Sequence, residues 1–267
     1  MISKEARLLR GFAVDFLTSH DVAAVEWLMD PAYRLSIGGY VLDGRDDGYL
    51  PATAAQLDLF PGLCVTVHDT IVGTAGVAMR FTEHGVSMRE KVASTWGGIT
   101  LFRMSGGRLS HGWAEEDYFA RKRQLKSGEC DAILPPHPCP WDAPAMPPSD
   151  QTERAARTWA NDPALLCGDE VEQIASEGPR FEACILPRSI TVSHLFSAGN
   201  RAALHLVCSG EYAGGFAEID EAQIGTPVEL RVAAMLDVAD GRVIRAQLSA
   251  DRLGLQRALL DRQRGTK

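Results

Sequence analysis

Hydrophobic residues recur with helical spacing at the start of the chain. One face of a helix predicted over residues 3–19 carries Leu8, Leu9, Phe12, Phe16 and Leu17. Asp21 follows as an N-cap for a short helix, because its carboxylate can accept a free backbone N–H. Residues 46–60 predict a further short helix, which must end before Pro61.

The pattern then changes to strands. Apolar and alternating runs predict strands over residues 64–72, 76–83, 91–104 and 108–116. The last two are joined by Ser-Gly-Gly at 105–107, a tight-turn signal. Helices followed by an antiparallel meander indicate an α+β domain, with the helices on one face of a curved sheet.

A proline-rich segment divides the chain into halves of similar size. Seven of the eighteen residues at 133–150 are proline, so this segment can form neither a helix nor a central strand. We therefore expect a first domain at 1–130, a linker at 131–150 and a second domain at 151–267.

The two halves resemble each other. Residues 102–125 align without gaps with 236–259, and 77–85 match 202–210. The alignment superposes Gly107 on Gly241 and Asp117 on Asp251. A tandem duplication is the simplest explanation. The alternative is that two unrelated α+β halves have similar residues at their hairpin turns by chance.

Composition excludes several classes of function. The formal net charge is −8, which argues against a general nucleic-acid binder. No apolar run reaches the roughly 18 residues of a membrane span, and the N-terminus is amphipathic rather than a signal peptide, so we expect a cytoplasmic protein. The six cysteines include no CxxC pair and predict free thiols, and His137-Pro138-Cys139 has no second ligand pair. We expect neither a metal nor a cofactor.

The richest candidate chemistry lies at the end of the first half. Read as a strand, residues 108–117 place alternate side chains on one face, namely Leu109, His111, Trp113, Glu115 and Asp117. The leucine and the tryptophan indicate that this face looks inward. An imidazole and two carboxylates on an inward face are unfavourable unless they are paired or used.

Each of these residues has two interpretations. Asp117 is either an acid/base in an apolar pocket or the N-cap of the following helix. His111 and Glu115 are catalytic and substrate-binding groups or a paired His–Glu at the rim, and Trp113 is a ligand platform or core. Further residues that can line the pocket, or lie at its rim or on the surface, are Arg80, His84, Tyr33 and Tyr40.

In the second half, most of the side chains on the equivalent strand face are different. The positions equivalent to the five above carry Val243, Arg245, Gln247, Ser249 and Asp251. A cation such as Arg245 beside Asp251 would hold that carboxylate ionised. The simplest interpretation is an active pocket in the first half and a pocket in the second half that has lost its activity. The alternative is a second pocket that takes an anionic ligand at Arg245.

Four stretches together resemble the SnoaL-like polyketide cyclases of the nuclear transport factor two-like superfamily. They are DPAYRLSIGG (30–39), LFPGLCVTVHD (59–69), VAMRFTEHG (77–85) and GGRLSHGWAEEDYFARKRQL (106–125). The resemblance covers most of residues 1–125 and implies a cone of helices wrapped by a curved sheet, with a deep apolar pocket. It also implies that Asp117 is the general acid/base of an intramolecular aldol closure. The dimer typical of the family, packed through its sheets, would be supplied within one tandem chain, and a further homodimer is left open.

The sequence departs from the family pattern at three positions. Ser36 stands near the place of a family histidine, and Leu101 and Arg103 stand where polar partners are usual. These departures bear on the aldol closure and leave the pocket itself unaffected. From the pocket and Asp117 we expect a cofactor-independent lyase or isomerase that cyclises, isomerises or dehydrates a hydrophobic polyketide- or steroid-like carbonyl compound. The alternatives are a carrier of a lipophilic metabolite and a structural pseudo-dimer that serves as an interaction module.

Overall fold

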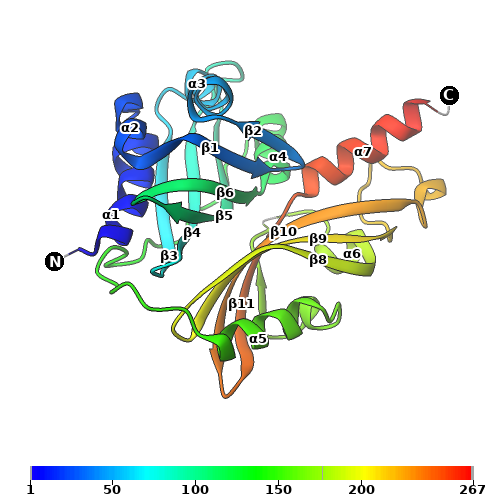
Figure 1. Cartoon of the computed structure of the whole chain (residues 1–267). Coiled ribbons are helices and arrows are strands. Elements are labelled where there is room, and N and C mark those ends of the chain that lie inside the picture. Colours follow the sequence, from blue (N-terminus) through cyan, green and yellow to red (C-terminus); the bar gives the residue numbers. More distant parts are fainter. Residues whose placement is uncertain (1, 176, 266–267) are drawn as a thin grey trace.

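The computed structural model describes residues 2–175 and 177–265, and these form two halves, each with its own curved sheet (Figure 1). The elements of the first half are α1 (Lys4–Arg10), η1 (Gly11–Thr18), η2 (Val22–Ala24), α2 (Val25–Leu28), β1 (Met29–Ile37), β2 (Tyr40–Asp43), η3 (Arg45–Tyr49), α3 (Leu50–Leu59), β3 (Cys64–Val72), β4 (Gly76–Val86), β5 (Ala93–Ser105), β6 (Arg108–Glu116) and α4 (Tyr118–Ser127). Those of the second half are α5 (Asp150–Ala160), η4 (Leu165–Cys167), β7 (Val171–Gln173), α6 (Phe181–Cys184), β8 (Ile185–Ala198), β9 (Arg201–Tyr212), η5 (Glu221–Gln223), β10 (Pro227–Ala239), β11 (Arg242–Ala250) and α7 (Arg252–Gly265).

The two sheets have matching topology. The first has the order β2-β1-β6-β5-β4-β3 and the second β7-β11-β10-β9-β8. In each, one strand from the front of the half pairs in parallel with the last strand, β1 with β6 and β7 with β11, and the remaining pairs are antiparallel. The expected α+β class with two such domains is confirmed.

Strands β1 and β2 were not expected from the sequence. Pro31 lies inside β1, and proline is rare within a strand because it cannot donate a backbone hydrogen bond. The proline is accommodated because the register of β1 on β6 shifts between Met29 and Arg34, so regular pairing begins only after it.

Helices cover the concave face of the first sheet and enclose its core. Helix α1 continues into the wider turns of η1, and both lie with α3 on one side of the sheet (Figure 1). Phe12 of η1 packs edge-on against Phe102 of β5, with ring centroids 4.8 Å apart. Asp21 caps the next turn as predicted, its carboxylate accepting from Ala23 N at 3.1 Å.

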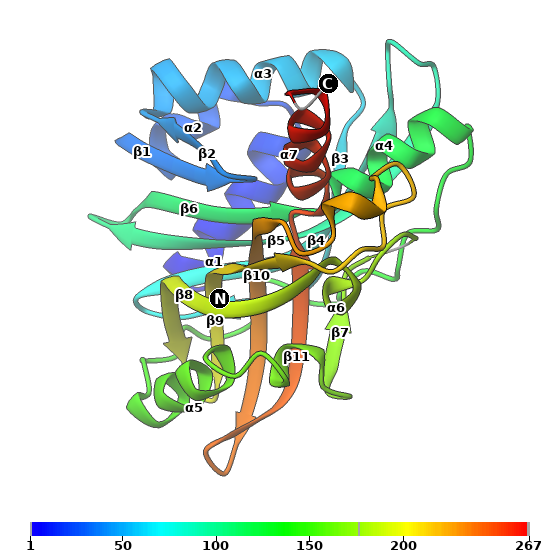
Figure 2. The same cartoon turned by 90° about the vertical axis from the view of Figure 1, so that its right-hand side faces the viewer.

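The convex faces of the two sheets pack against each other. Figures 1 and 2 show the two sheets crossing, with helices on their outer sides. The apolar contact is made by Ile71, Ala78, Ile99, Leu101, Trp113, Phe196, Ala198, Ala203, Ala233 and Met235. The chain therefore contains its own sheet-to-sheet interface.

The segment between α4 and α5, residues 128–149, is called the strap. It runs along the edge strand β3, where the backbone N–H of His137 donates to Val67 O and that of Met146 donates to Val72 O, at 2.8 and 3.0 Å. These bonds pair part of an edge that would otherwise be open. No helix in the described ranges is long and apolar enough to cross a membrane.

Candidate functional site

A cavity of about 160 Å³ lies inside the first cone, between η1, α3 and the concave face of the sheet. Its walls are Phe12, Leu17, Leu35, Ile37, Leu42, Tyr49, Ala52, Thr53, Gln56, Phe81, Glu83, Thr100, Ala114, Glu116 and Tyr118. The sheet leaves room here because its central strands carry small residues. Thr100 of β5 pairs with Ala114 of β6, and Gly98 pairs with Glu116.

The second cone is filled at the same positions. The β10–β11 ladder has the register of β5–β6, which places Val232 opposite Ala250 and Ala234 opposite Leu248. Leu248 thus stands where the first half has Ala114. Its side chain joins a large apolar cluster that includes Trp159, Phe181 and Leu206. Among the described residues, the second half therefore packs a leucine side chain at the position where Ala114 borders the cavity of the first.

Two buried carboxyl groups form one wall of the cavity in the first cone. Glu83 of β4 and Glu116 of β6 flank Trp96 of β5, which is the register partner of Glu83. The indole Nε1 donates to Glu116 Oε2 at 3.0 Å, and Gln56 Nε2 donates to Glu83 Oε2 at 2.8 Å. Gly98 makes this possible, because a Cβ there would lie 2.8 Å from Glu116 Cγ. In the second cone, Cys208, Leu230 and Ala250 occupy the positions of Glu83, Trp96 and Glu116.

Burial controls the protonation of this pair. It raises the pKa of Glu83 well above its usual value, and the negative charge of Glu116 raises it further. Burial also raises the pKa of Glu116, against the opposing effects of a hydrogen bond with Tyr118, the Arg121 charge and the Trp96 donor. Two nearby carboxyl groups in an apolar site do not both ionise readily. The pair therefore favours one carboxylic acid beside one carboxylate.

The guanidinium of Arg121 lies beside this pair within a set of aromatic rings. It lies 4.3 Å from the ring centroid of Tyr118, 4.9 Å from that of Trp96 and 5.7 Å from that of Phe60. Cation–π contacts hold a cation in place without neutralising it. Arg121 thus supplies positive potential to the two carboxyl groups while its N–H donors remain available.

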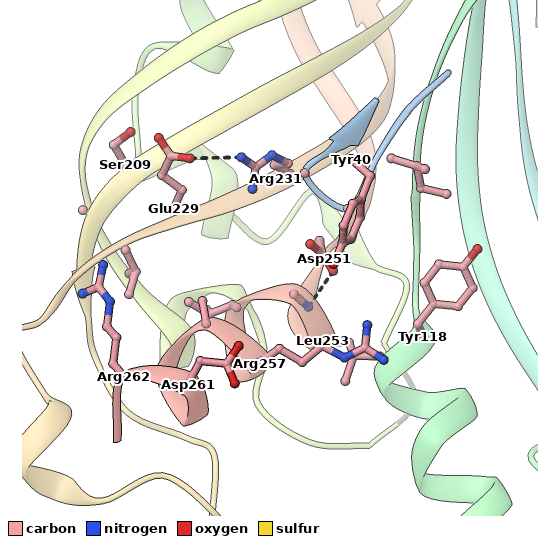
Figure 3. Close-up of a pocket in the computed structure, with 18 of the residues that line it drawn as sticks. Tyr40, Tyr118, Ser209, Glu229, Arg231, Asp251, Leu253, Arg257, Asp261 and Arg262 are labelled. Carbon is pink, nitrogen blue, oxygen red and sulfur yellow. Dashed lines mark hydrogen bonds and ion pairs between the residues drawn. The ribbon is translucent and has the colours of Figure 1, made fainter. Parts of the chain in front are cut away.

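A larger cleft adjoins the cone. It measures about 920 Å³ and lies between the first half and the strands and last helix of the second (Figure 3). Ile37, Gln56 and Tyr118 line both the cleft and the cone cavity, so the two spaces share a wall. On its other side, the cleft is lined by β10 and α7, which contribute Arg231, Asp251 and Arg257 among others.

Asp117 is placed away from the cone cavity. It caps α4, with its Oδ1 accepting from Ala120 N at 3.2 Å, and both its oxygens accept from Arg252 Nη2 at 2.6 Å. It is not among the described residues that line the cone cavity. The geometry is that of a helix cap and an ion pair between the halves, beside a separate pocket of about 260 Å³, and the acid/base role of Asp117 stays a prediction.

The face of β6 predicted to look into the pocket looks instead at the second sheet. Trp113 is stacked between the rings of His111 and His194, with centroids 3.7 and 3.9 Å away. Glu115 Oε1 is 2.9 Å from His205 Nε2. Two causes explain the error. A register shift near Arg103 and Met104 breaks the alternation between Leu109 and His111, and the second sheet buries the face that would otherwise be exposed.

Ionisable side chains between the two sheets have shifted pKa values. Burial and the charges of Arg103 and Arg34 lower the pKa of His111 to about 4, and burial with the charge of Arg231 lowers the pKa of His205 to about 4. Burial and the charge of Asp251 raise the pKa of Glu115 well above its usual value. The two histidines are therefore neutral at neutral pH, and burial disfavours the charged form of Glu115.

The remaining candidates are scattered. Arg80 faces the second half and pairs with Glu172 at 2.7 Å, and His84 Nε2 lies 3.1 Å from Thr66 Oγ1. Tyr33 is fully buried in the core of the first cone, with its ring 5.1 Å from that of Tyr49. Tyr40 is 68% exposed and lines the cleft.

The candidates of the second half also separate. Asp251 caps α7, accepting from Gly254 N at 2.8 Å, and lines the cleft. Arg245 lies 3.5 Å from Glu172 and 3.9 Å from Asp237, so its charge is met by two carboxylates. Within the described residues, no group of three or more His, Cys, Asp or Glu side chains is placed to hold a metal ion.

Glu83, Glu116, Trp96 and Gln56 were missed, although the sequence carries a signal for the two glutamates. Glu83 lies on the same face of β4 as the buried residues Val77, Met79 and Phe81. This apolar face of the strand therefore ends on a carboxylate. The small residues Gly112 and Ala114 share a face with Glu116 and mark the hollow side of β6. On the opposite face of β6, the large side chain of Trp113 packs against the second sheet. Gln56 lies on a helix and has no comparable pattern.

The chain is similar in structure to several solved proteins, each corresponding to about half of it. A candidate SnoaL-like polyketide cyclase from Jannaschia sp. CCS1 is 15% identical, with a TM-score of 0.44, and the match covers 47% of this chain and 94% of that one. IdmH, a candidate polyketide cyclase from Streptomyces antibioticus, is 18% identical over 46% of this chain and 99% of its own, with a TM-score of 0.41. TerC, crystallised with polyporic acid, is 15% identical over 46% and 99% of the two chains, with a TM-score of 0.41. No protein-family model matches the sequence, and no curated protein does.

Proposed function

We propose that the first half is a small-molecule enzyme in which Glu83 and Glu116 move protons on a hydrophobic carbonyl compound. The observation that carries this proposal is the buried carboxyl pair itself. It lines a cavity in one cone, while the other cone has Cys208, Leu230 and Ala250 in place of the two glutamates and the tryptophan between them. The fold therefore forms without these costly buried groups, and a function explains their presence in the first cone.

The chemistry needs both protonation states of the pair. The carboxylate removes a proton from the carbon beside the carbonyl, and the carboxylic acid donates its proton to the carbonyl oxygen. The product is an enol, and each carboxyl group has exchanged its role. In all three outcomes the enol O–H returns its proton to the glutamate that has become the carboxylate, and the glutamate that has become the acid gives its proton up. Delivery of that proton to another carbon isomerises the substrate. Delivery to a second carbonyl oxygen, as the enol carbon attacks that carbonyl, closes a ring, and delivery to a β-hydroxyl releases water.

Polyketide- or steroid-like compounds with fused rings fit this arrangement in part. A cavity of about 160 Å³ holds roughly one ring, because a cavity of about 150 Å³ accepts benzene. The rest of a larger substrate would extend into the adjoining cleft of about 920 Å³. The reacting carbon would lie in the cone, beside Glu83 and Glu116.

Exchange of substrate hydrogen for deuterium tests the proposal whichever product is formed. A panel of hydrophobic cyclic ketones is incubated with the protein in D₂O and followed by proton NMR. We expect catalysed exchange that falls about 100-fold or more in Glu83→Gln and in Glu116→Gln. The exposed Glu129→Gln is the matched control and should keep the full rate. A ketone that binds without exchange, or exchange that survives both cone substitutions, would contradict the proposal and favour a carrier.

A further inference from the structure

We infer that the cleft between the halves binds an anionic group of the ligand, a carboxylate or a phosphate, at Arg121 and Arg257. The inference deepens the proposed function, because it names the charge of the molecule whose reacting ring occupies the first cone. It follows from which charged groups in the cleft already have partners.

The acidic groups of the cleft are all engaged. Glu229 pairs with Arg231 at 3.0 Å, and Asp261 lies 3.5 Å from Arg264. Asp251 accepts a hydrogen bond from Gly254 N, and burial raises its pKa. Among the described residues, no hydrogen bond or ion pair joins any of the three carboxylates to Arg121 or Arg257, and the charge of Arg257 acts on Asp251 only from a distance, lowering its pKa against the effect of burial.

The two arginines differ from the others in the cleft. Arg257 is exposed on α7 and, among the described residues, its guanidinium has neither an ion pair nor a hydrogen bond. Figure 3 shows it extending from the helix toward Tyr118 of the first half. Arg121 is half-buried against Phe60, Trp96 and Tyr118, and no side chain or backbone oxygen of the described residues accepts from its guanidinium.

The position of the pair defines the shape of the ligand. Both arginines line the cleft, together with Tyr118, which also lines the cone cavity. A molecule with a ring in the cone can therefore place an acidic tail between α4 and α7. Guanidinium groups bind carboxylate and phosphate oxygens through paired N–H donors, and rings that hold the arginine reduce the entropy lost on binding.

The site exists only because the chain is a tandem. Arg121 belongs to the last helix of the first half and Arg257 to the last helix of the second. Either half alone presents one of the two cations. The second half thus contributes to ligand binding although its own cone is filled.

Binding of three probes tests the inference without turnover. The probes are 4-(2-naphthyl)butanoate, its uncharged methyl ester and 4-(2-naphthyl)butyl phosphate, titrated by calorimetry at fixed ionic strength. We expect at least one of the two anions to bind ten-fold or more tightly than the ester, and the tighter anion identifies the group. Arg257→Gln, a change at an exposed position, should remove about ten-fold of that preference and leave the ester within two-fold.

Two further variants make the result specific. Arg121→Lys keeps a charge between the rings and should retain more anion preference than Arg121→Gln. Arg108→Gln, at the exposed β5–β6 turn, removes the same charge outside the cleft and should change nothing. Equal affinity for ester and both anions, or an Arg108→Gln effect as large as that of Arg257→Gln, would overturn the inference.

The test of the anion site and the test of the proposed chemistry can fail independently of each other. Anion preference that persists in Glu83→Gln and Glu116→Gln, with ketone exchange absent throughout, would count against the chemistry and support the anion site. Exchange that depends on the glutamates, without any anion preference, would do the reverse.

Discussion

The guanidinium of Arg252 binds both carboxylate oxygens of Asp117 at 2.6 Å, and both side chains are almost fully buried. Asp117 caps the last helix of the first half, and Arg252 is the first residue of the last helix of the second. The two helices that end the repeats are thus joined to each other by a charge pair.

Asp117→Asn should destabilise the protein by about 3–5 kcal/mol, because it leaves the buried Arg252 charge without its partner. Urea unfolding measures the loss. Asp251→Asn is the matched control, since Asp251 caps α7 in the equivalent way and, among the described residues, makes no ion pair with an arginine, although the charges of Arg231 and Arg257 act on it. It should lose only about 1 kcal/mol. Equal losses at the two caps would show that the ion pair contributes nothing.

Ala114→Leu should close the first cone. The substitution copies Leu248 of the second half and fills the cavity of about 160 Å³. We expect binding of apolar ring compounds to disappear with little change in stability, because apolar volume is added to an existing void. The reverse change, Leu248→Ala, should cost about 2–5 kcal/mol by opening a cavity in a packed core. Undiminished binding by Ala114→Leu would place the ligand elsewhere.

The buried glutamates should make stability fall as pH rises. The pKa of Glu83 is raised in the folded state above the usual 4.5, so the folded protein holds this proton more tightly than the unfolded chain. Stability is therefore fully present below pH 4.5 and declines as the pH rises through the folded value.

Glu83→Gln should flatten that decline and exceed the wild type in unfolding free energy at pH 8. Urea midpoints measured from pH 4.5 to 9 check this. Glu129→Gln should follow the wild type. A Glu83→Gln curve parallel to the wild type would mean that the carboxyl group is not desolvated.

His205 should act in the opposite direction. Its pKa is about 4 in the folded state against the usual 6.5, so its contribution to stability is present above pH 6.5 and is lost as the pH falls toward 4. Besides burial, the charges of Arg231, His194 and His111 lower its pKa, and Glu115 is its hydrogen-bond partner.

His205→Gln can still donate to Glu115 and should lessen the acid loss by up to about 3 kcal/mol, since each pKa unit corresponds to about 1.4 kcal/mol. Unfolding free energies between pH 6.5 and pH 4 measure the difference. An acid loss as large in the variant as in the wild type would rule out His205 as its source.

Much of the fold could be predicted from hydrophobic spacing. The strand expected over 64–72 is β3 and that over 108–116 is β6, because alternation and the Ser-Gly-Gly turn are local signals. The repeat predicted the matching sheets. The expected domain boundaries stay predictions, since the strap packs along β3 and does not separate the halves.

The site could be predicted less well, for physical reasons. Alternation along β6 separates two faces without indicating which one encloses the cavity. The apolar Trp113 suggested the inner face, but the second sheet makes the outer face equally dry. Glu83 and Glu116 become neighbours only through the β4–β5–β6 register, which no local pattern contains.

The strap makes the meeting of the two sheets an event within one molecule. For separate subunits, dilution below the dissociation constant would part the sheets and dismantle any ligand site shared by Arg121 and Arg257. Here the local concentration of one half around the other is set by the length of 128–149, whatever the amount of protein in solution. Two unlike halves consequently stay in a one-to-one ratio, and no cell needs to match their levels of synthesis.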